Sequence, residues 1–68
     1  MNRRQVTVSL DATYPLTVEA GDEVAQGQAL QQATPDAAGS IAPIGGRVER
    51  IEFDPGNHQM VVTISAHA

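Results

Sequence analysis

Two segments near the ends of this chain alternate apolar and polar residues with a period of two, and this pattern constrains the fold more than any other feature. Residues 5–10 read QVTVSL and residues 59–65 read QMVVTIS. Such alternation, rich in β-branched residues, is typical of a β-strand that buries one face. Turn-forming residues recur along the chain at spacings of roughly eight to twelve residues. The sequence therefore predicts an all-β domain of about six or seven short strands.

Shorter extended segments are predicted between these two strands. In the first of them, Leu16 and Val18 keep the alternation, and Pro15 suits the start of a strand because it has no N–H to donate. The predicted segments are residues 14–19, a short piece ending near Val24, residues 28–32, residues 41–44 and residues 47–53.

A helix is the alternative for residues 20–33, which have fair helix propensity. Gly21 and Gly27 would each cost about 1 kcal/mol inside such a helix. The apolar residues Val24 and Leu30 are also too sparse to form a helical stripe. We therefore prefer glycine-containing turns and short strands in this region.

The strand that precedes the last one has a phase slip. Val48 has an even residue number, whereas Ile51 and Phe53 have odd ones, so in a regular strand Val48 would point to the opposite face. A β-bulge near Glu49 or Arg50 would turn all three apolar side chains inward. We therefore predict a bulged strand here.

Two loops are predicted from their turn-forming residues. Residues 34–40 read TPDAAGS, a composition typical of a connecting loop. Residues 54–57 read DPGN, which predicts a type II turn with Pro55 second and Gly56 third.

The size of the chain limits the core. Its 68 residues weigh 7.2 kDa, which predicts a folded surface of roughly 4,100 Å² with about 60% of the unfolded chain's surface buried. With one Phe, one Tyr and no Trp, the core must consist of small aliphatic residues. We expect one domain over residues 1–68, frayed at residues 1–4 and 66–68, and without a deep cavity for a large cofactor.

Composition also excludes several classes of function. The chain has no cysteine, which excludes disulfides, thiolate zinc sites and iron–sulfur clusters. Its formal net charge of −4 opposes binding to nucleic acids and to anionic membrane surfaces. We read no signal peptide and no run of apolar residues long enough for a membrane span, so we expect no membrane insertion and a cytoplasmic location.

No catalytic residue and no metal ligand are predicted. His58 and His67 lack the spacing of a metal site, and we expect both to be exposed. The charges of Arg47 and Arg50 alternate with acidic residues, which indicates pairing across strands rather than a basic patch. Four aspartates at predicted turns are expected to cap backbone N–H groups: Asp11, Asp22, Asp36 and Asp54.

Two motifs resemble those of biotinyl/lipoyl carrier domains. Residues 21–30 read GDEVAQGQAL, which matches the pattern G-D-x-V-x-x-G-Q-x-L of that family. Residues 42–51 read APIGGRVERI and resemble its A-P-x-x-G-x-V-x-x-I segment. The resemblance covers about residues 16–53, and it implies a flattened barrel-sandwich hybrid of two small sheets.

The resemblance does not extend to the chemistry of the carriers. In that family a lysine at a hairpin tip is joined to biotin or lipoate. The corresponding tip falls on Thr34, Pro35, Asp36 and Ala37, and the chain contains no lysine at all. We therefore expect no cofactor. These four residues stay a candidate recognition loop, because loops on rigid scaffolds often carry recognition.

The second half of the chain differs from the carriers in another way. Where they repeat the first motif, this chain has a short Pro/Gly turn at residues 54–57 and then a terminal apolar strand. This arrangement is more similar to the small barrel-sandwich segment in the C subunit of Rnf-type electron-transport complexes, and to the related A subunit of sodium-pumping quinone reductases. Those segments are unmodified and structural.

These observations favour a non-catalytic protein-binding or scaffold module of a larger assembly. We expect a protein partner or self-association, with contacts through edge strands at Gln5–Leu10 and Gln59–Ser65. The alternative is a degenerate carrier that docks to a carboxylase, a dehydrogenase or a ligase without being modified. A third hypothesis, binding of a small molecule, requires an apolar concavity lined by polar groups.

Overall fold

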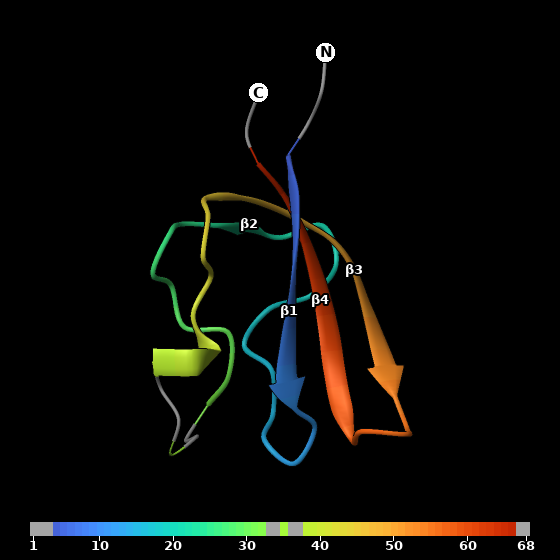
Figure 1. Cartoon of the computed structure of the whole chain (residues 1–68). Coiled ribbons are helices and arrows are strands. Elements are labelled where there is room, and N and C mark those ends of the chain that lie inside the picture. The colour runs from blue at the N-terminus through green and yellow to red at the C-terminus, as the bar shows by residue number, and fades with distance from the viewer. Residues whose placement is uncertain (1–3, 33–34, 36–37, 67–68) are drawn as a thin grey trace.

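A computed structural model describes residues 4–32, 35 and 38–66 of the chain. Its strands form one antiparallel sheet with the order β1-β4-β3-β2 (Figure 1). The all-β prediction is confirmed. Residues 20–32 contain no helix, so the helical alternative for this region is wrong. The elements are β1 (Gln5–Asp11), β2 (Glu23–Val24), the 3₁₀ turn η1 (Ala38–Ser40), β3 (Gly46–Asp54) and β4 (Gln59–Ala66).

The strand β4 lies at the centre of the sheet, between β1 and β3. The prediction that Gln59–Ser65 is an edge strand is therefore wrong. Its polar residues Thr63 and Ser65 are each only 2% exposed, because the neighbouring strands flank them on both sides. Of the two predicted edges, only the first, within β1, is an edge of the sheet.

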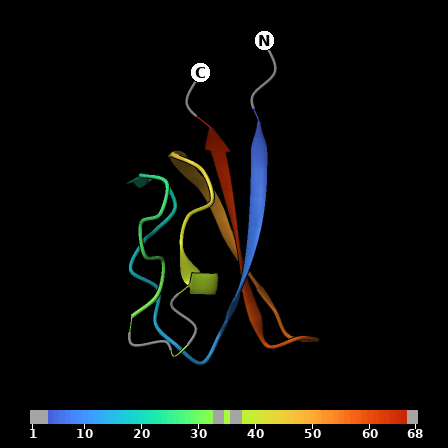
Figure 2. The ribbon, with the colours of Figure 1, turned by 60° about the vertical axis from the view of Figure 1, so that its left-hand side comes forward.

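A β-bulge in β3 confirms the predicted phase slip. The register with β4 shifts between Val48 and Arg50, so that Glu49 is the extra residue. Val48 is fully buried and Ile51 packs against the core, as predicted. Phe53 lies on the same face as Ile51, as predicted, but it remains 52% exposed and is not part of the core. The hairpin of β3 and β4 projects beyond the rest of the chain at this end (Figure 2).

The turn between β3 and β4 differs from the predicted type II turn. Asp54 pairs with Gln59, which leaves residues 55–58 as the loop. The residue with a positive φ is His58, at 52°, whereas Gly56 has none. Loops of this length are most often built on a type I turn, and a left-handed residue then leads into the next strand.

Residues 12–22 and 25–45, as far as they are described, form an irregular layer against one face of the sheet (Figure 2). We call this part of the chain the loop layer. Single bridges join Leu16 to Gln31 and Ala29 to Ile41. Three segments predicted as strands therefore form isolated bridges instead of a second regular sheet, and the described residues form four strands rather than six or seven. The segments are residues 14–19, 28–32 and 41–44.

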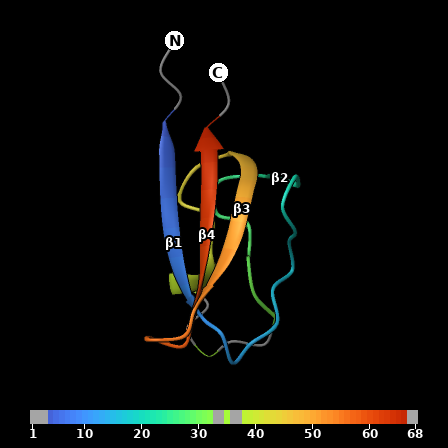
Figure 3. The same cartoon turned by 90° about the vertical axis from the view of Figure 1, so that its right-hand side faces the viewer.

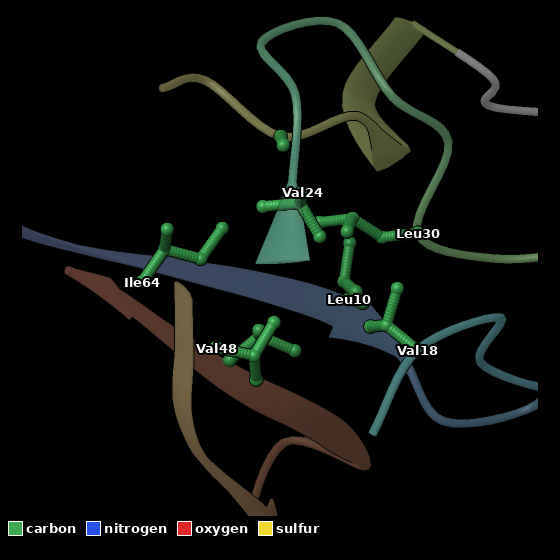
Figure 4. Packing of buried hydrophobic residues seen from close by; sticks show 8 residues of the cluster. Leu10, Val18, Val24, Leu30, Val48 and Ile64 are labelled. Atoms are coloured by element: carbon green, nitrogen blue, oxygen red, sulfur yellow. The ribbon is translucent and has the colours of Figure 1, made fainter. Parts of the chain in front are cut away.

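The core lies between the sheet and the loop layer and consists of small aliphatic residues, as predicted. Turns at Gly21 and Gly27, with φ of 98° and 87°, bracket the short strand β2. Val24 of β2 and Leu30 of the loop layer point toward Leu10 of β1 (Figure 4). The buried apolar residues are Leu10, Val18, Val24, Leu30, Ala42, Val48, Val62 and Ile64.

Arg4 and Ala66 lie within the two chain ends that were predicted to be frayed, but both are held by a hydrogen bond. The backbone N–H of Ala66 donates to the carbonyl of Arg4 at 2.8 Å, so neither residue is frayed. Residues 1–3 and 67–68 lie outside the described part of the chain. Among the described residues, no helix is long and apolar enough to cross a membrane.

Gln31 joins the loop layer to the end of β1 and is only 5% exposed. Its Nε2 donates to the carbonyl oxygens of Asp11 and Tyr14, at 2.6 and 3.3 Å. Its Oε1 accepts a hydrogen bond from Ser40 Oγ at 2.9 Å. The sequence pattern placed Gln31 on a strand but gave no sign of this role, because its partners are distant along the chain.

Replacing Gln31 with alanine should lower the free energy of unfolding by about 1–3 kcal/mol, since it removes the three hydrogen bonds of a buried side chain. Urea denaturation followed by circular dichroism measures this loss. The neighbouring Gln32 has an exposed side chain, and Gln32→Ala is the matched control, with an expected change within about 0.5 kcal/mol. Equal midpoints for the two variants would contradict the role assigned to Gln31.

Candidate functional site

The candidate recognition loop lies mostly outside the described residues. Thr34, Asp36 and Ala37 are not among them. Pro35 is described and exposed, and η1 follows the loop. The prediction of a recognition site here stays a prediction.

Three of the four turn aspartates cap backbone N–H groups, as predicted, and Asp36 lies outside the described residues. Asp22 accepts from the backbone N of Glu19 at 2.9 Å, and Asp54 accepts from that of Gly56 at 3.1 Å. The Asp11 carboxylate accepts from the backbone N of Thr13 at 2.9 Å. This hydrogen bond holds the pKa of Asp11 below its ordinary value, and the positive charge that His58 can carry lowers it further. These carboxylates therefore have local structural partners.

His58 lies in the β3–β4 turn and is exposed, as predicted, whereas His67 lies outside the described residues. The rings of His58 and Phe53 form a T-shaped contact, with an angle of 86° between their planes and 6.0 Å between their centroids. Within the described ranges, no three His, Cys, Asp or Glu residues gather closely enough to hold a metal ion.

The arginines of β3 lie among acidic residues. Arg50 Nε is 3.6 Å from Glu52 Oε1, and both side chains are more than half exposed. This pair lies within one strand, so the prediction of cross-strand pairing is wrong for Arg50. Arg47 stands directly opposite Glu23 of β2 in the register. Exposed pairs of this kind add little stability.

The free edge of β1 is the feature of the structure best suited to an interaction. The register pairs each β1 residue with one β4 residue, from Gln5–Ser65 to Asp11–Gln59. Beyond its two ends, Ala66 N donates to Arg4 O at 2.8 Å, and Ala12 N donates to His58 O at 3.1 Å. In an antiparallel pair, hydrogen-bonded and non-hydrogen-bonded positions alternate. The even residues of β1 therefore direct their backbone groups toward β4, and the odd residues direct theirs outward.

Three of these outward-facing residues keep their backbone groups available. The carbonyl of Asp11 already accepts from Tyr14 N and from Gln31 Nε2. No hydrogen bond joins the outward N–H and C=O groups of Gln5, Thr7 and Ser9 to any residue in the described part of the chain. β1 is the strand nearest the viewer in Figure 1 and the leftmost strand of the sheet in Figure 3, with no other labelled strand on its outer side.

This edge lacks the features that usually protect an edge strand. Natural edges are short, charged, bulged or interrupted by proline. β1 is 7 residues long and pairs with β4 without a bulge. Residues 5–10 contain neither a charge nor a proline. The opposite edge is formed by β2, which has only 2 residues and carries Glu23, and by the rest of β3, which has a bulge and carries Arg50 and Glu52. β1 is thus the long, open edge of the sheet.

No known relative supports a function by comparison. The chain matches no protein-family model, no curated protein and no solved structure. Function is therefore inferred from the geometry of β1.

The sequence predicted a contact at residues 5–10 but not which of its groups are free. The outward parity of Gln5, Thr7 and Ser9 follows from the register with β4, which depends on a strand nearly sixty residues away. The available signal was the uncharged, proline-free run QVTVSL, which is unusual for an edge strand.

Proposed function

We propose that this chain is a non-catalytic protein-binding module of a larger assembly, and that it binds by adding a strand of another polypeptide to the edge of β1. The observation that carries the proposal is the row of free backbone groups at Gln5, Thr7 and Ser9. Main-chain hydrogen bonds supply affinity in this mode of recognition, and side chains at alternate positions supply specificity.

The surroundings of the edge suit such a partner. The side chains of Gln5, Thr7 and Ser9 are exposed on one face of the sheet, whereas Val6 and Val8 are half-buried on the other. An added strand would therefore meet a polar row on one face and an apolar row on the other. A bound segment with its own alternation of apolar and polar residues fits both rows.

A peptide library tests this function. Short extended peptides are displayed, and those that bind the whole chain are selected. Thr7→Pro removes the outward N–H of Thr7 and places a ring in the path of the added strand, without removing a hydrogen bond to β4. We expect Thr7→Pro to weaken the binding of selected peptides at least about tenfold, measured by fluorescence anisotropy on dilute protein. Thr7→Val keeps the backbone N–H and should bind within about threefold of the unmodified chain.

Peptides that bind Thr7→Pro and Thr7→Val equally well would place the binding surface elsewhere and contradict the proposal. Circular dichroism of both variants checks that they remain folded. If no selected peptide distinguishes the variants and the chain is also monomeric, the edge of β1 accepts no strand and the proposal is wrong.

The degenerate carrier is a second proposal, supported by the contact between the two motifs that resemble the carriers. Gly27 N donates to Ala42 O at 2.8 Å, and Ala42 N donates to Gln28 O at 2.9 Å. The two motifs thus lie side by side. Titration with a biotin ligase and a lipoate ligase, followed by calorimetry, tests it. Binding without any change in the mass of the chain would support a docking role, and the absence of binding would contradict docking to these ligases.

A further inference from the structure

We propose that the strand bound at this edge is β1 of a second copy of the chain, paired antiparallel about a two-fold axis at Thr7. This inference rests on the proposed function, because it names the partner of the same edge. The dimer would join the two sheets into one continuous sheet, with the two β1 strands at its centre.

The hydrogen-bond pattern selects the register. Outward-facing residues must oppose outward-facing residues, so the odd positions of one copy must face the odd positions of the other. Centring the axis on Thr7 places Gln5 opposite Ser9 of the second copy and Thr7 opposite its own equivalent. Each such pair exchanges two bonds, which gives about six new hydrogen bonds.

This register uses the backbone groups that are free and avoids the one that is occupied. A dimer centred on Val8 would place Gln5 opposite Asp11 of the second copy. The carbonyl of Asp11 already accepts two hydrogen bonds, from Tyr14 N and Gln31 Nε2. Centring on Thr7 leaves Asp11 outside the new pairing, at the end where the loop layer approaches β1.

The side chains of this segment are complementary to themselves. Residues 5–9 carry no charge, so no like charges face each other across the axis. Thr7 meets Thr7, and threonine pairs are favourable neighbours across antiparallel strands. Val6 and Val8, half-buried in the single chain, would face each other's equivalents on the apolar side and be covered further. A closed two-fold pairing uses up both open edges at once.

The absence of cysteine from the chain allows a direct test with single-cysteine variants. In the proposed register the two Thr7 residues are directly opposite, at a Cα separation of about 5.5 Å, which is within the range of a disulfide. The two Ser9 residues would be offset by four residues, or about 13 Å. We expect Thr7→Cys to form a covalent dimer under mild oxidation, and Ser9→Cys to remain uncrosslinked under the same conditions.

Analytical ultracentrifugation of the unmodified chain over a range of concentrations measures the dimer itself. We expect Thr7→Pro to raise the dissociation constant at least about tenfold, and Thr7→Val to leave it within about threefold. If Thr7→Pro fails to fold, NMR of a sample that mixes isotope-labelled and unlabelled copies of the unmodified chain tests the register instead. Hα–Hα contacts between Val6 of one copy and Val8 of the other are then expected, because these residues form a closely spaced non-hydrogen-bonded pair.

The possible outcomes separate this inference from the proposed function. A monomer at all concentrations that still binds selected peptides at β1 overturns the dimer and keeps the strand-binding function. A dimer that crosslinks equally through Thr7→Cys and Ser9→Cys, or that shows contacts between Val6 and Leu10, overturns the register. A dimer unaffected by Thr7→Pro overturns the use of this edge.

Discussion

Replacing Gly46 with alanine should leave most of the molecules unfolded, because it lowers the free energy of unfolding by about 3 kcal/mol or more. Gly46 pairs with Val24 of β2 on one side and with Ala66 of β4 on the other. A Cβ at this position would overlap the carbonyl oxygen of Ser65 and stand 2.8 Å from its carbonyl carbon and 3.0 Å from Ala66 Cα. These are backbone atoms of the central strand, so the overlap is relieved only by moving β3 away from β4.

Gly45 offers a matched control one residue away. A Cβ there would lie 3.6 Å from Gln26 N and 3.7 Å from Val24 O, which are ordinary contact distances. Its φ is not in the left-handed region, so alanine causes no strain of that kind. We expect Gly45→Ala to change the free energy of unfolding by less than about 1 kcal/mol in urea denaturation. Equal losses from Gly45→Ala and Gly46→Ala would show that β3 and β4 do not approach each other as closely as the structure has them.

The contrast between these glycines shows what the sequence could predict and what it could not. The motif placed glycines before Val48, and the parity of Val48 and Ile51 was enough to predict the bulge, because both signals are local. Which glycine is crowded depends on β4, whose end returns beside β3 from the far end of the chain. No local pattern distinguishes Gly45 from Gly46.

The position of β4 in the sheet was the main error, and it has a physical cause. Alternation in QMVVTIS indicates one buried face, which suits an edge as well as a central strand. The two adjacent valines, Val61 and Val62, were a weak sign of burial on both faces. Because β1 flanks β4 instead of leaving it exposed, β1 is an edge of the sheet along its whole length, and the candidate site lies there.

The loop layer was predicted less well than the sheet because long-range contacts hold it together. Leu16 and Gln31 form a bridge that neither local segment specifies. Pro15 and Pro43 have no N–H to donate, so regular ladders cannot extend through the segments that contain them. The alternation of residues 14–19 correctly indicates a buried side chain, since Val18 is 5% exposed. It does not indicate how the backbone of this segment pairs.

Leu30→Ala should be the most damaging core truncation in the loop layer, with a loss of about 2–5 kcal/mol. Leu30 is fully buried, and its side chain fills the space between Val24 and Leu10 (Figure 4). Its backbone N donates to Ser40 O and its carbonyl accepts from Thr17 N, at 2.7 and 2.9 Å, so the layer cannot easily collapse onto the cavity. A domain of this size has a stability of about 3–5 kcal/mol, so a large fraction of Leu30→Ala molecules should be unfolded.

Ile41→Ala is the matched control, because Ile41 lies in the adjoining segment of the layer but is 38% exposed. We expect Ile41→Ala to lower the free energy of unfolding by about 1 kcal/mol. The volume-conserving Leu30→Met should lower it by less than about 1.5 kcal/mol. The loop layer is the cover over the apolar face of the sheet, so the two should unfold together. In Leu30→Ala the amides of Thr17, in the layer, and Val62, in the sheet, should then exchange with solvent at similar rates. Slow exchange at Val62 with fast exchange at Thr17 would mean that the sheet holds without the layer, and would contradict the core as described.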